Sequence, residues 1–470
     1  MKQMPTCSRT RMGLALAFLS LSACVVGPDY HPPKLDAGQG WAEQVAGADG
    51  LSTPWWRSLH DDQIRTLVER LLADNPNVQA SRERIRQARA QRDAAHAGLW
   101  PQVAASVSLD HLRQSENGPL PLNKIPFIPR NENLRDSEFD ASWDLDLFGA
   151  RRRAVESAQA QQAAFVAEDE DLRKSLVAEL VREIFYLRAQ QAALSASQQE
   201  VTLRQRDLAA VQRQVAVGEL PRSALDQAEY DEKEAAAVLP AERADLRGAA
   251  LAIATLCGRR PEWGLSLLQT QEPLPPVPPV ALGQRVDVLA RRPDVRAAER
   301  RLAAATADIG TAKAQWFPQL SLGAAVGYQS LQNNNWFSAS SQTGDIFPML
   351  RWQIFSAGAI QAQVHLRQAR QRELARIYVA TVLSALADAE RRLFNEQQSL
   401  IALQEQQQAW SAAQSADRHA AHALTVGEIA LQERLDAALL RCRAEAHMQS
   451  LQAAALMDWV ALNKALSWPI

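Results

Sequence analysis

Four stretches of the chain alternate regularly between apolar and polar residues. In 138–147, Phe139, Ala141 and Trp143 lie on one face of an extended chain, and acidic residues lie on the other. The same pattern gives three more apolar faces, formed by Val103, Ala105, Val107 and Leu109; by Leu320, Leu322, Ala324, Val326 and Tyr328; and by Leu350, Trp352 and Ile354. A period of two over about ten residues with one apolar face is typical of transmembrane β-barrel strands, although four strands of a soluble sandwich would show it too.

The four segments form two predicted β-hairpins, over 102–147 and 319–356, whose polar loops span 114–135 and 332–345. Long loops on one side of a barrel are typical of the cell exterior. Four strands cannot close a barrel in lipid, because the backbone groups at the open edges would stay unpaired. Several chains must therefore share one barrel. Two chains would give eight strands and an interior filled by side chains, whereas three would give twelve strands and a usable lumen.

Most of the remaining sequence predicts helix. The stretches 150–217 and 359–426 contain neither proline nor glycine, and each can extend about 100 Å as a helix. Each ends at a glycine, Gly218 or Gly427, after which 221–257 and 430–466 predict shorter returning helices. Glycine at a helix end followed by proline at the next helix start fits the usual capping asymmetry. Each half of the chain therefore carries a long helical hairpin, although a solvated coiled-coil rod would have a similar composition.

The chain also contains an internal repeat. Residues 75–102 align with 292–319 without a gap, at an offset of 217, and the ends of the two long helices align at an offset of 209. This period is far longer than that of a solenoid, so it indicates two interlocked halves. We predict an N-terminal segment over 24–61, a first repeat over 62–271, a proline-rich linker over 272–291 and a second repeat over 292–470. Trp55 and Trp56 are expected to anchor the N-terminal segment against the helices.

The N-terminus has the features of a bacterial lipoprotein signal peptide over 1–23. Basic residues precede an apolar stretch that is too short to span a bilayer, and Leu21-Ser22-Ala23-Cys24 then resembles a lipobox. An ordinary signal peptide that happens to contain a cysteine is the alternative. Lipid on Cys24 would tie the mature chain to a membrane. Cys257 and Cys442 then remain, and we expect both to be buried, unpaired thiols.

Charge and motifs exclude several classes of function. A net charge of −2 and a pI near 6.5 give no basic surface for nucleic acid. The sequence has no nucleophile elbow, phosphate loop or metal-binding cysteine cluster, so we expect neither an enzyme nor a cofactor. His419 and His422 lie one helical turn apart, but two ligands without a third are more often a solvated face.

Several blocks of the sequence resemble a known family. They are Cys24-Val25-Val26-Gly27-Pro28-Asp29-Tyr30, Trp55-Trp56, Trp143-Asp144-Leu145-Asp146-Leu147-Phe148-Gly149, Arg292-Pro293-Asp294-Val295 and Trp316-Phe317-Pro318-Gln319. Together they look like the lipoprotein (NodT-type) branch of the TolC-like outer membrane factors, over about 24–468. The resemblance implies an α+β membrane protein. Three chains would form a twelve-stranded β-barrel in the bacterial outer membrane, continued by a long α-helical barrel in the periplasm with a belt around its middle.

The resemblance also implies a function and its sites. The protein would be the exit channel of a tripartite efflux system, receiving substrate from an inner-membrane transporter through a periplasmic adaptor. The adaptor would face the two hairpin tips, which comprise Val217, Gly218, Glu219, Val426, Gly427 and Glu428. Asp436 would ring the narrow periplasmic entrance, with Gln432 beside it and Asp226 as its weaker repeat equivalent. Gln432 and Leu439 depart from the family pattern at the gate. The competing hypotheses are a structural, lipid-anchored coiled-coil protein without a conducting lumen and a lipid-anchored envelope hydrolase.

Overall fold

The computed structural model describes residues 25–34, 38, 40–42, 53–115 and 130–470. The described chain is mostly helical and contains one four-stranded antiparallel sheet. Among these residues, no helix combines the length and the apolar character needed to cross a bilayer.

The chain folds into two compact units, and each unit combines segments from both repeats. The first unit contains Ile85–Phe165 and Ala298–Tyr378 with the described residues up to Pro33, and the second contains Lys34–Arg84, Val166–Ala297 and Val379–Ile470. Four helices contribute residues to both units: α3 (Pro76–Ala97), α4 (Ala150–Ala216), α8 (Pro293–Ala314) and α9 (Ala359–Val426). The two halves of the sequence are therefore interlocked within each unit.

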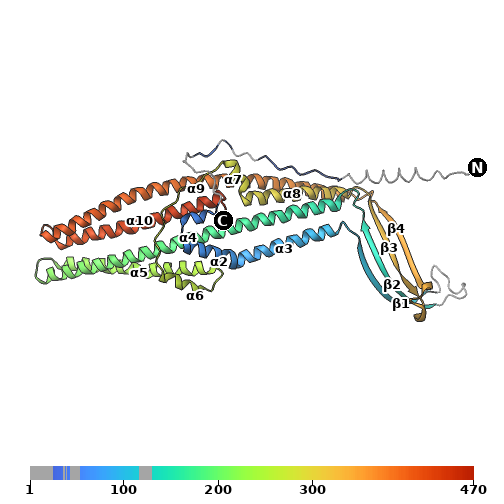
Figure 1. Cartoon of the computed structure of the whole chain (residues 1–470), viewed down its shortest axis with the longest axis horizontal. Coiled ribbons are helices and arrows are strands. Elements are labelled where there is room, and N and C mark those ends of the chain that lie inside the picture. Colours follow the sequence, from blue (N-terminus) through green and yellow to red (C-terminus); the bar gives the residue numbers. More distant parts are fainter. Residues whose placement is uncertain (1–24, 35–37, 39, 43–52, 116–129) are drawn as a thin grey trace, which may run out of the picture. The chain divides into compact units, whose positions relative to one another are not determined.

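The sheet belongs to the first unit. Its strands are β1 (Gln102–Arg113), β2 (Asn131–Asp144), β3 (Gln319–Ser330) and β4 (Gln342–Arg351), hydrogen-bonded in that order (Figure 1). The two predicted hairpins form, and β2 also pairs with β3, which joins them into one sheet. Within the described residues, the outer edges of β1 and β4 pair with no strand.

The strand ends differ from the sequence prediction. The strands extend into the expected loops, because β2 begins at Asn131 and β4 at Gln342. They also end early, at Asp144 and Arg351, although the apolar alternation continues to 147 and 354. The reason in the first hairpin is a turn at Asp146, whose φ is +34°. Alternation in the sequence continues for a few residues into a turn that no longer pairs.

The repeat is preserved in the detail of the structure. Helices α3 and α8 each have 22 residues and begin 217 residues apart. The indole of Trp143 donates to the carbonyl oxygen of Leu99 at 2.9 Å, and that of Trp352 donates to Trp316 at 3.0 Å. These two hydrogen bonds are related by the offsets of 209 and 217 found in the sequence. The repeat therefore describes atomic contacts as well as residue types.

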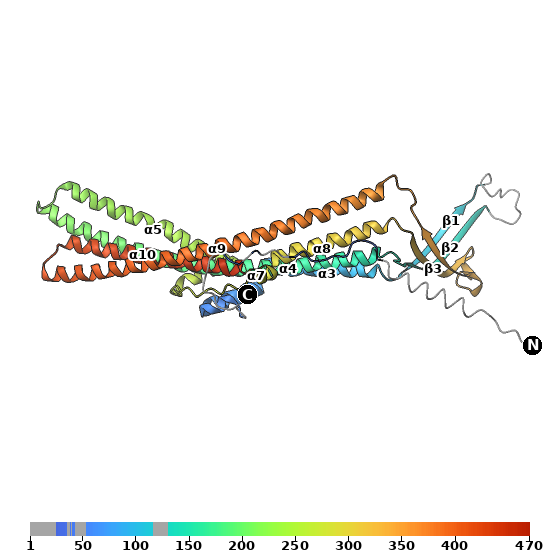
Figure 2. The same ribbon diagram turned by 90° about the horizontal axis from the view of Figure 1, so that it is seen from above.

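The second unit contains the ends of two helical hairpins. Helix α4 returns as α5 (Arg222–Leu256), and α9 returns as α10 (Leu431–Ala465). Both turns lie at the same end of this unit (Figure 2). Each turn begins with a glycine at positive φ, +81° at Gly218 and +79° at Gly427, a conformation that glycine adopts without a Cβ clash. The predicted helical hairpins and their glycine ends are confirmed.

The core of the second unit lies where the hairpins meet the rest of the chain. Trp55 of the short helix η1 (Trp55–Leu59) packs edge-on against Trp459 at 5.5 Å, beside α2 (Asp62–Asp74), as expected of an anchor. Short elements follow α5: α6 (Pro261–Gly264), η3 (Leu265–Gln269) and α7 (Arg285–Arg291). Helix α7 occupies the end of the expected linker over 272–291. In the first unit, η4 (Asn333–Asn335) and η5 (Ala339–Ser341) lie between β3 and β4.

Cys257 and Cys442 are buried and free, as predicted. Burial raises the pKa of the Cys257 thiol to about 11, so this thiol stays protonated at neutral pH. Burial also raises the pKa of Cys442, whose Sγ lies 3.3 Å from the carbonyl oxygen of Ala196. Both side chains therefore act as small packing groups.

Candidate functional site

The two faces of the sheet have opposite chemistry. Side chains such as Val103, Val107 and Ile346 project from one face and are strongly exposed in the single chain. The other face carries a row of carboxylates on β2, formed by Asp136, Glu138, Asp140 and Asp144. Exposed aliphatic side chains along a sheet face are unfavourable in water and favourable against lipid. The arrangement suits one wall of a barrel with lipid outside and an acidic aqueous interior.

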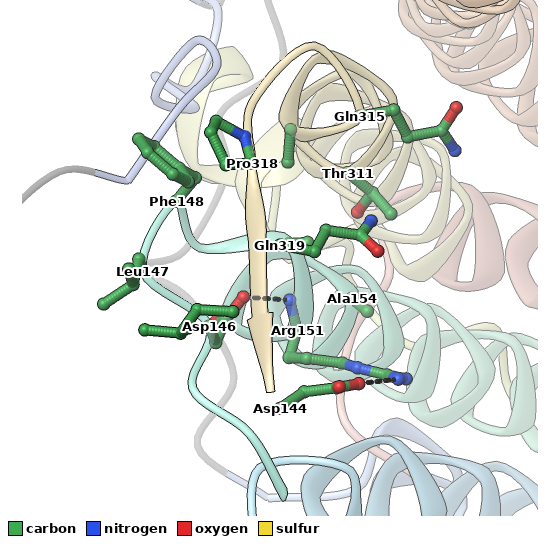
Figure 3. Close-up of a pocket in the computed structure, with 13 residues that line it drawn as sticks. Asp144, Asp146, Leu147, Phe148, Arg151, Ala154, Thr311, Gln315, Pro318 and Gln319 are labelled. Atoms are coloured by element: carbon green, nitrogen blue, oxygen red, sulfur yellow. Dashed lines mark hydrogen bonds and ion pairs between the residues drawn. The ribbon is translucent and has the colours of Figure 1, made fainter. Parts of the chain in front are cut away.

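A tight turn connects β2 to α4 and lines a cavity of about 240 Å³ (Figure 3). Asp146 accepts backbone hydrogen bonds from Arg151 at 2.8 Å and Arg152 at 3.0 Å, so it caps the first turn of α4. The guanidinium of Arg151 reaches back to Asp144 at 2.6 Å. These contacts satisfy the charged groups around the cavity within the turn itself. The arrangement is a rigid joint between strand and helix.

The predicted lipidation site, Cys24, lies outside the described residues. The residues that follow it are held against the first unit. Arg153, whose side chain is only 5% exposed, binds Asp29 at 2.7 Å and the carbonyl oxygen of Val26 at 3.3 Å. The backbone N–H of Val26 donates to Phe148 at 3.1 Å. A lipid chain on Cys24 would therefore be tethered through a fixed segment. Arg153 gave no signal in the sequence, where it is one of three consecutive arginines.

The hairpin tips are exposed, with an apolar residue in each. At both tips the backbone N–H after the glycine bonds back into the helix, from Glu219 to Gln214 and from Glu428 to Ala423, each at 2.9 Å. Apart from each glycine and its two chain neighbours, no described atom lies within 4 Å of a Cβ placed on Gly218 or Gly427. Val217 and Val426 are both exposed. The tips are therefore closed turns whose outer surfaces are free to meet another molecule.

The predicted gate residue Asp436 is exposed on α10, with Gln432 one turn before it on the same face. Its environment includes a carboxylate that the sequence analysis missed. Burial raises the pKa of Asp207 on α4, and the charges of Asp436 and Asp231 raise it further, against the effect of Arg204. Asp226 lies exposed on α5 and pairs only loosely with Arg222, at 3.6 Å. The charge of Asp436 on α10 therefore acts on Asp207 on α4, which belongs to the other hairpin.

Ion pairs hold the helices together near these carboxylates. Arg204 of α4 contacts Asp231 of α5 at 3.2 Å, and Arg441 of α10 contacts Asp417 of α9 at 3.1 Å. One pair links the two hairpins, from Arg443 on α10 to Glu200 on α4, with an Nε to oxygen distance of 3.1 Å. The sequence did contain one signal for this region. Asp207 precedes Gly218 by eleven residues and Asp436 follows Gly427 by nine, so both lie roughly 15 Å from a tip.

Comparison with known proteins identifies the family of this architecture. The sequence profile of the outer membrane efflux protein family matches residues 67–259 and 285–467, one segment in each repeat. Nodulation protein T of Rhizobium leguminosarum bv. trifolii is 28% identical over 387 residues, which cover 82% of this chain and 81% of the relative. Cation efflux system protein CusC of Escherichia coli K12 is 27% identical, with 76% of each chain covered. The solved structure of the outer-membrane channel OprN has a TM-score of 0.81 at 28% identity, covering 95% of this chain and 99% of that one.

These comparisons confirm the predicted fold class and the resemblance to outer membrane factors. A mostly helical chain with one four-stranded antiparallel sheet is the architecture of the channel structures, and the trimer and the two repeats fit them. The predicted location in the bacterial outer membrane, extending into the periplasm, is confirmed as well. The structural coiled-coil alternative is not favoured, because these relatives are efflux channels.

Proposed function

Because this chain belongs to the family of outer membrane efflux proteins, we propose that it forms the exit duct of a tripartite efflux system. Three copies close a twelve-stranded barrel, and their helices receive substrate from an inner-membrane transporter through a periplasmic adaptor. Substrate passes through the channel without chemical change, so the chain is not an enzyme and needs no cofactor. The observation that carries the proposal is a sheet with one exposed apolar face, one acidic face and two open edges.

The adaptor is proposed to dock at the hairpin tips. Support comes from the exposed side chains of Val217 and Val426, each next to a glycine with free space above it. Glu219 and Glu428 place a carboxylate beside each valine. An apolar residue with an adjacent charge offers both contact area and electrostatic selection to a facing helix end.

The gate is proposed to lie where Asp436 approaches Asp207. In a trimer these residues would contribute six carboxylates near the axis, a charged constriction of the kind that favours cations. The charge of Asp436 opposes ionisation of Asp207, whereas the ion pair of Arg443 with Glu200 joins α10 to α4. Interactions of this kind between exposed charges contribute at most about 1 kcal/mol each, so the arrangement is easily shifted. Gln432 lies on the same face, and Asp226 is the weaker candidate.

The anchor and the domain plan complete the proposal. Lipid on Cys24 would hold the fixed segment from Val25 to Tyr30 at the inner surface of the outer membrane, because these residues contact the joint between β2 and α4. The chain is proposed to divide into a first repeat over 62–271 and a second over 292–470.

Conductance of the purified full-length protein in a planar bilayer tests the function, and native mass spectrometry in detergent tests the trimer. We expect three chains and a cation-selective current. Asp436→Ala should raise the conductance and weaken cation preference, whereas Asp245→Ala, at an exposed carboxylate of α5 farther from the tip, is the matched control and should change neither. A protein that assembles as three chains but conducts no current would refute the duct and leave a structural role.

A further inference from the structure

The apolar face of the sheet changes its chemistry at the strand ends that lie farthest from the helices. Helix α3 leads into the start of β1, and β2 leads into α4, so the far end comprises the end of β1 and the start of β2. This end faces the cell exterior, because the protein lies in the outer membrane and extends into the periplasm. Val107 and Leu109 are the last aliphatic residues that β1 places on this face before that end.

Basic side chains follow Leu109 on the same face. Residues that lie opposite each other in antiparallel strands project to one face of the sheet. Leu109 lies opposite Arg135, and the next two residues of β1 on this face are His111 and Arg113. Both lie opposite asparagines of β2. The outer end of the apolar face therefore carries two guanidinium groups and an imidazole.

The charges of the strands are segregated between the two faces of the sheet. Every carboxylate of the four strands projects from the other face; these residues are Asp110, Glu132, Asp136, Glu138, Asp140, Asp144 and Asp345. Arg351 also projects from that face, where β4 leads into α9. On the apolar face, none of the described strand residues is acidic. A ligand that meets Arg113 and Arg135 from this side therefore meets positive charge alone.

The two guanidinium groups keep donors available for such a ligand. Nη1 of Arg135 donates to the carbonyl oxygen of Leu331 at 3.1 Å and to that of Asn133 at 3.3 Å. These contacts orient the guanidinium and leave its charge uncompensated. Arg113 is exposed and forms no ion pair with a described residue. A guanidinium presents several N–H donors in a planar fork that matches the oxygens of a phosphate group.

An aromatic cluster marks the level at which the arginines lie. Tyr328 projects from the apolar face of β3 and lies opposite Ser137, one pair closer to the helices than Arg135. Phe337 packs edge-on against Tyr328 at 5.6 Å and is 68% exposed, and Trp336 stacks on Phe337 at 4.9 Å. Aromatic side chains of membrane barrels lie at the boundary between the hydrocarbon and the headgroups. Arg135 and the residues beyond it therefore lie at the level of the headgroups.

We propose that Arg113, His111 and Arg135 bind the phosphate groups of a diphosphorylated glycolipid in the outer leaflet, with its acyl chains along the apolar face. Charge-assisted hydrogen bonds from arginine to phosphate are among the strongest that a protein surface offers. Arg113 and Leu109, the partner of Arg135, lie four residues apart on β1, which is roughly 13 Å along the strand. This spacing suits two phosphate groups, and a headgroup with a single phosphate would leave one guanidinium without a partner.

The proposal goes beyond the efflux function, because it requires only that the sheet lies in the outer membrane. It adds a lipid ligand on the outside of the barrel wall. The acidic interior and the helical hairpins take no part in it.

Native mass spectrometry of the full-length protein in detergent, with lipids added at increasing concentration, tests the proposal. Diphosphoryl lipid A should form adducts with the assembled protein, monophosphoryl lipid A should bind about fivefold more weakly, and phosphatidylethanolamine more weakly still. Combining Arg113→Gln with Arg135→Gln should weaken binding of diphosphoryl lipid A about 25-fold, since each arginine near a phosphate surface contributes about a factor of five. Arg351→Gln removes an arginine from the other face, so this matched control should bind like the unmodified protein.

The comparison of lipids and variants can overturn the proposal in several ways. Equal binding of diphosphoryl lipid A and phosphatidylethanolamine would do so, as would an equal loss in Arg351→Gln and in the double variant. Displacement of lipid A by millimolar inorganic phosphate would show that free phosphate, and not the lipid, is the ligand. If the double variant does not assemble, each single variant should show a loss of about fivefold, and unchanged binding in both would overturn the proposal.

A second measurement separates this inference from the proposed function. The bilayer current of the double variant should equal that of the unmodified protein, because the substituted side chains project away from the acidic face. Lipid A adducts on a protein that conducts no current would refute the duct and leave the lipid site standing. A conducting protein without such adducts would refute the lipid site alone.

Discussion

Glu396 offers a quantitative test of how buried charge affects the stability of the second helical hairpin. Its side chain lies in α9 and is 3% exposed. Burial, together with the nearby carboxylate of Asp458 on α10, raises the pKa of Glu396 to about 7. Asp458 is held in place by the hydroxyl of Ser399, which donates to it. Protonation of Glu396 therefore removes both a buried charge and a repulsion between two helices.

The sign and size of the effect follow from the two pKa values. In the unfolded chain Glu396 should titrate near 4.5, whereas in the folded chain it titrates near 7. The stability that protonated Glu396 contributes is therefore fully present below the pKa of the unfolded chain. It is lost as the pH rises through the pKa of the folded chain. The difference between these two pKa values corresponds to a loss of at most about 3 kcal/mol in the free energy of unfolding per chain. Because a chain of this length unfolds with an entropy of roughly 1 kcal/mol per kelvin, the melting temperature should fall by about 3 °C between pH 5 and pH 8.

Thermal unfolding of the detergent-solubilised protein, followed by helical circular dichroism at one scan rate, measures this difference. Glu396→Gln should abolish this part of the pH dependence and melt higher than the unmodified protein at pH 8. Glu405→Gln, on the exposed face of the same helix, is the matched control and should leave the pH dependence unchanged. If the melting temperature falls by the same amount between pH 5 and pH 8 in Glu396→Gln and in the unmodified protein, the buried carboxylate is not the cause of the pH dependence.

Three further predictions address docking, the gate and the anchor. Replacing Gly218 and Gly427 with glutamine should abolish export but leave trimers in the outer membrane, since each turn loses only about 1 kcal/mol and a Cβ at either position has free space around it. Drug susceptibility and trimer abundance in the same strains check this. Acidification through the raised pKa of Asp207 should weaken cation preference, because protonation removes a carboxylate from the proposed constriction, and Asp207→Asn should show this weaker preference already at neutral pH. A cation preference that does not change with pH in the unmodified protein would contradict this gate. Arg153→Ala should loosen the segment after Cys24 by removing charge-assisted bonds to it, and limited proteolysis before Tyr30 should then be faster than in Arg151→Ala.

The sequence by itself determined the elements and their equivalence. Strict alternation around Trp143 and Trp352 identified the strands, because side chains of a strand point to opposite faces with a period of two. Long stretches without proline or glycine identified α4 and α9, and Gly218 and Gly427 marked their ends, because only a residue without a Cβ adopts positive φ at no cost. These signals are local, so they can be recognised without knowing what packs against them.

Only the tertiary structure decided which distant side chains meet. The charge of Asp436 acts on Asp207 from a different hairpin, and no spacing along one helix reveals the rotation of another. Arg153 binds the segment after Cys24 through a fold that brings residues more than a hundred positions apart into contact. The pairing of β2 with β3 joins the hairpins into one sheet, and the open edges of β1 and β4 follow from it. The physical reason is that strand alternation fixes which face a side chain occupies, whereas the choice of partner depends on the burial and hydrogen bonds of the whole assembly.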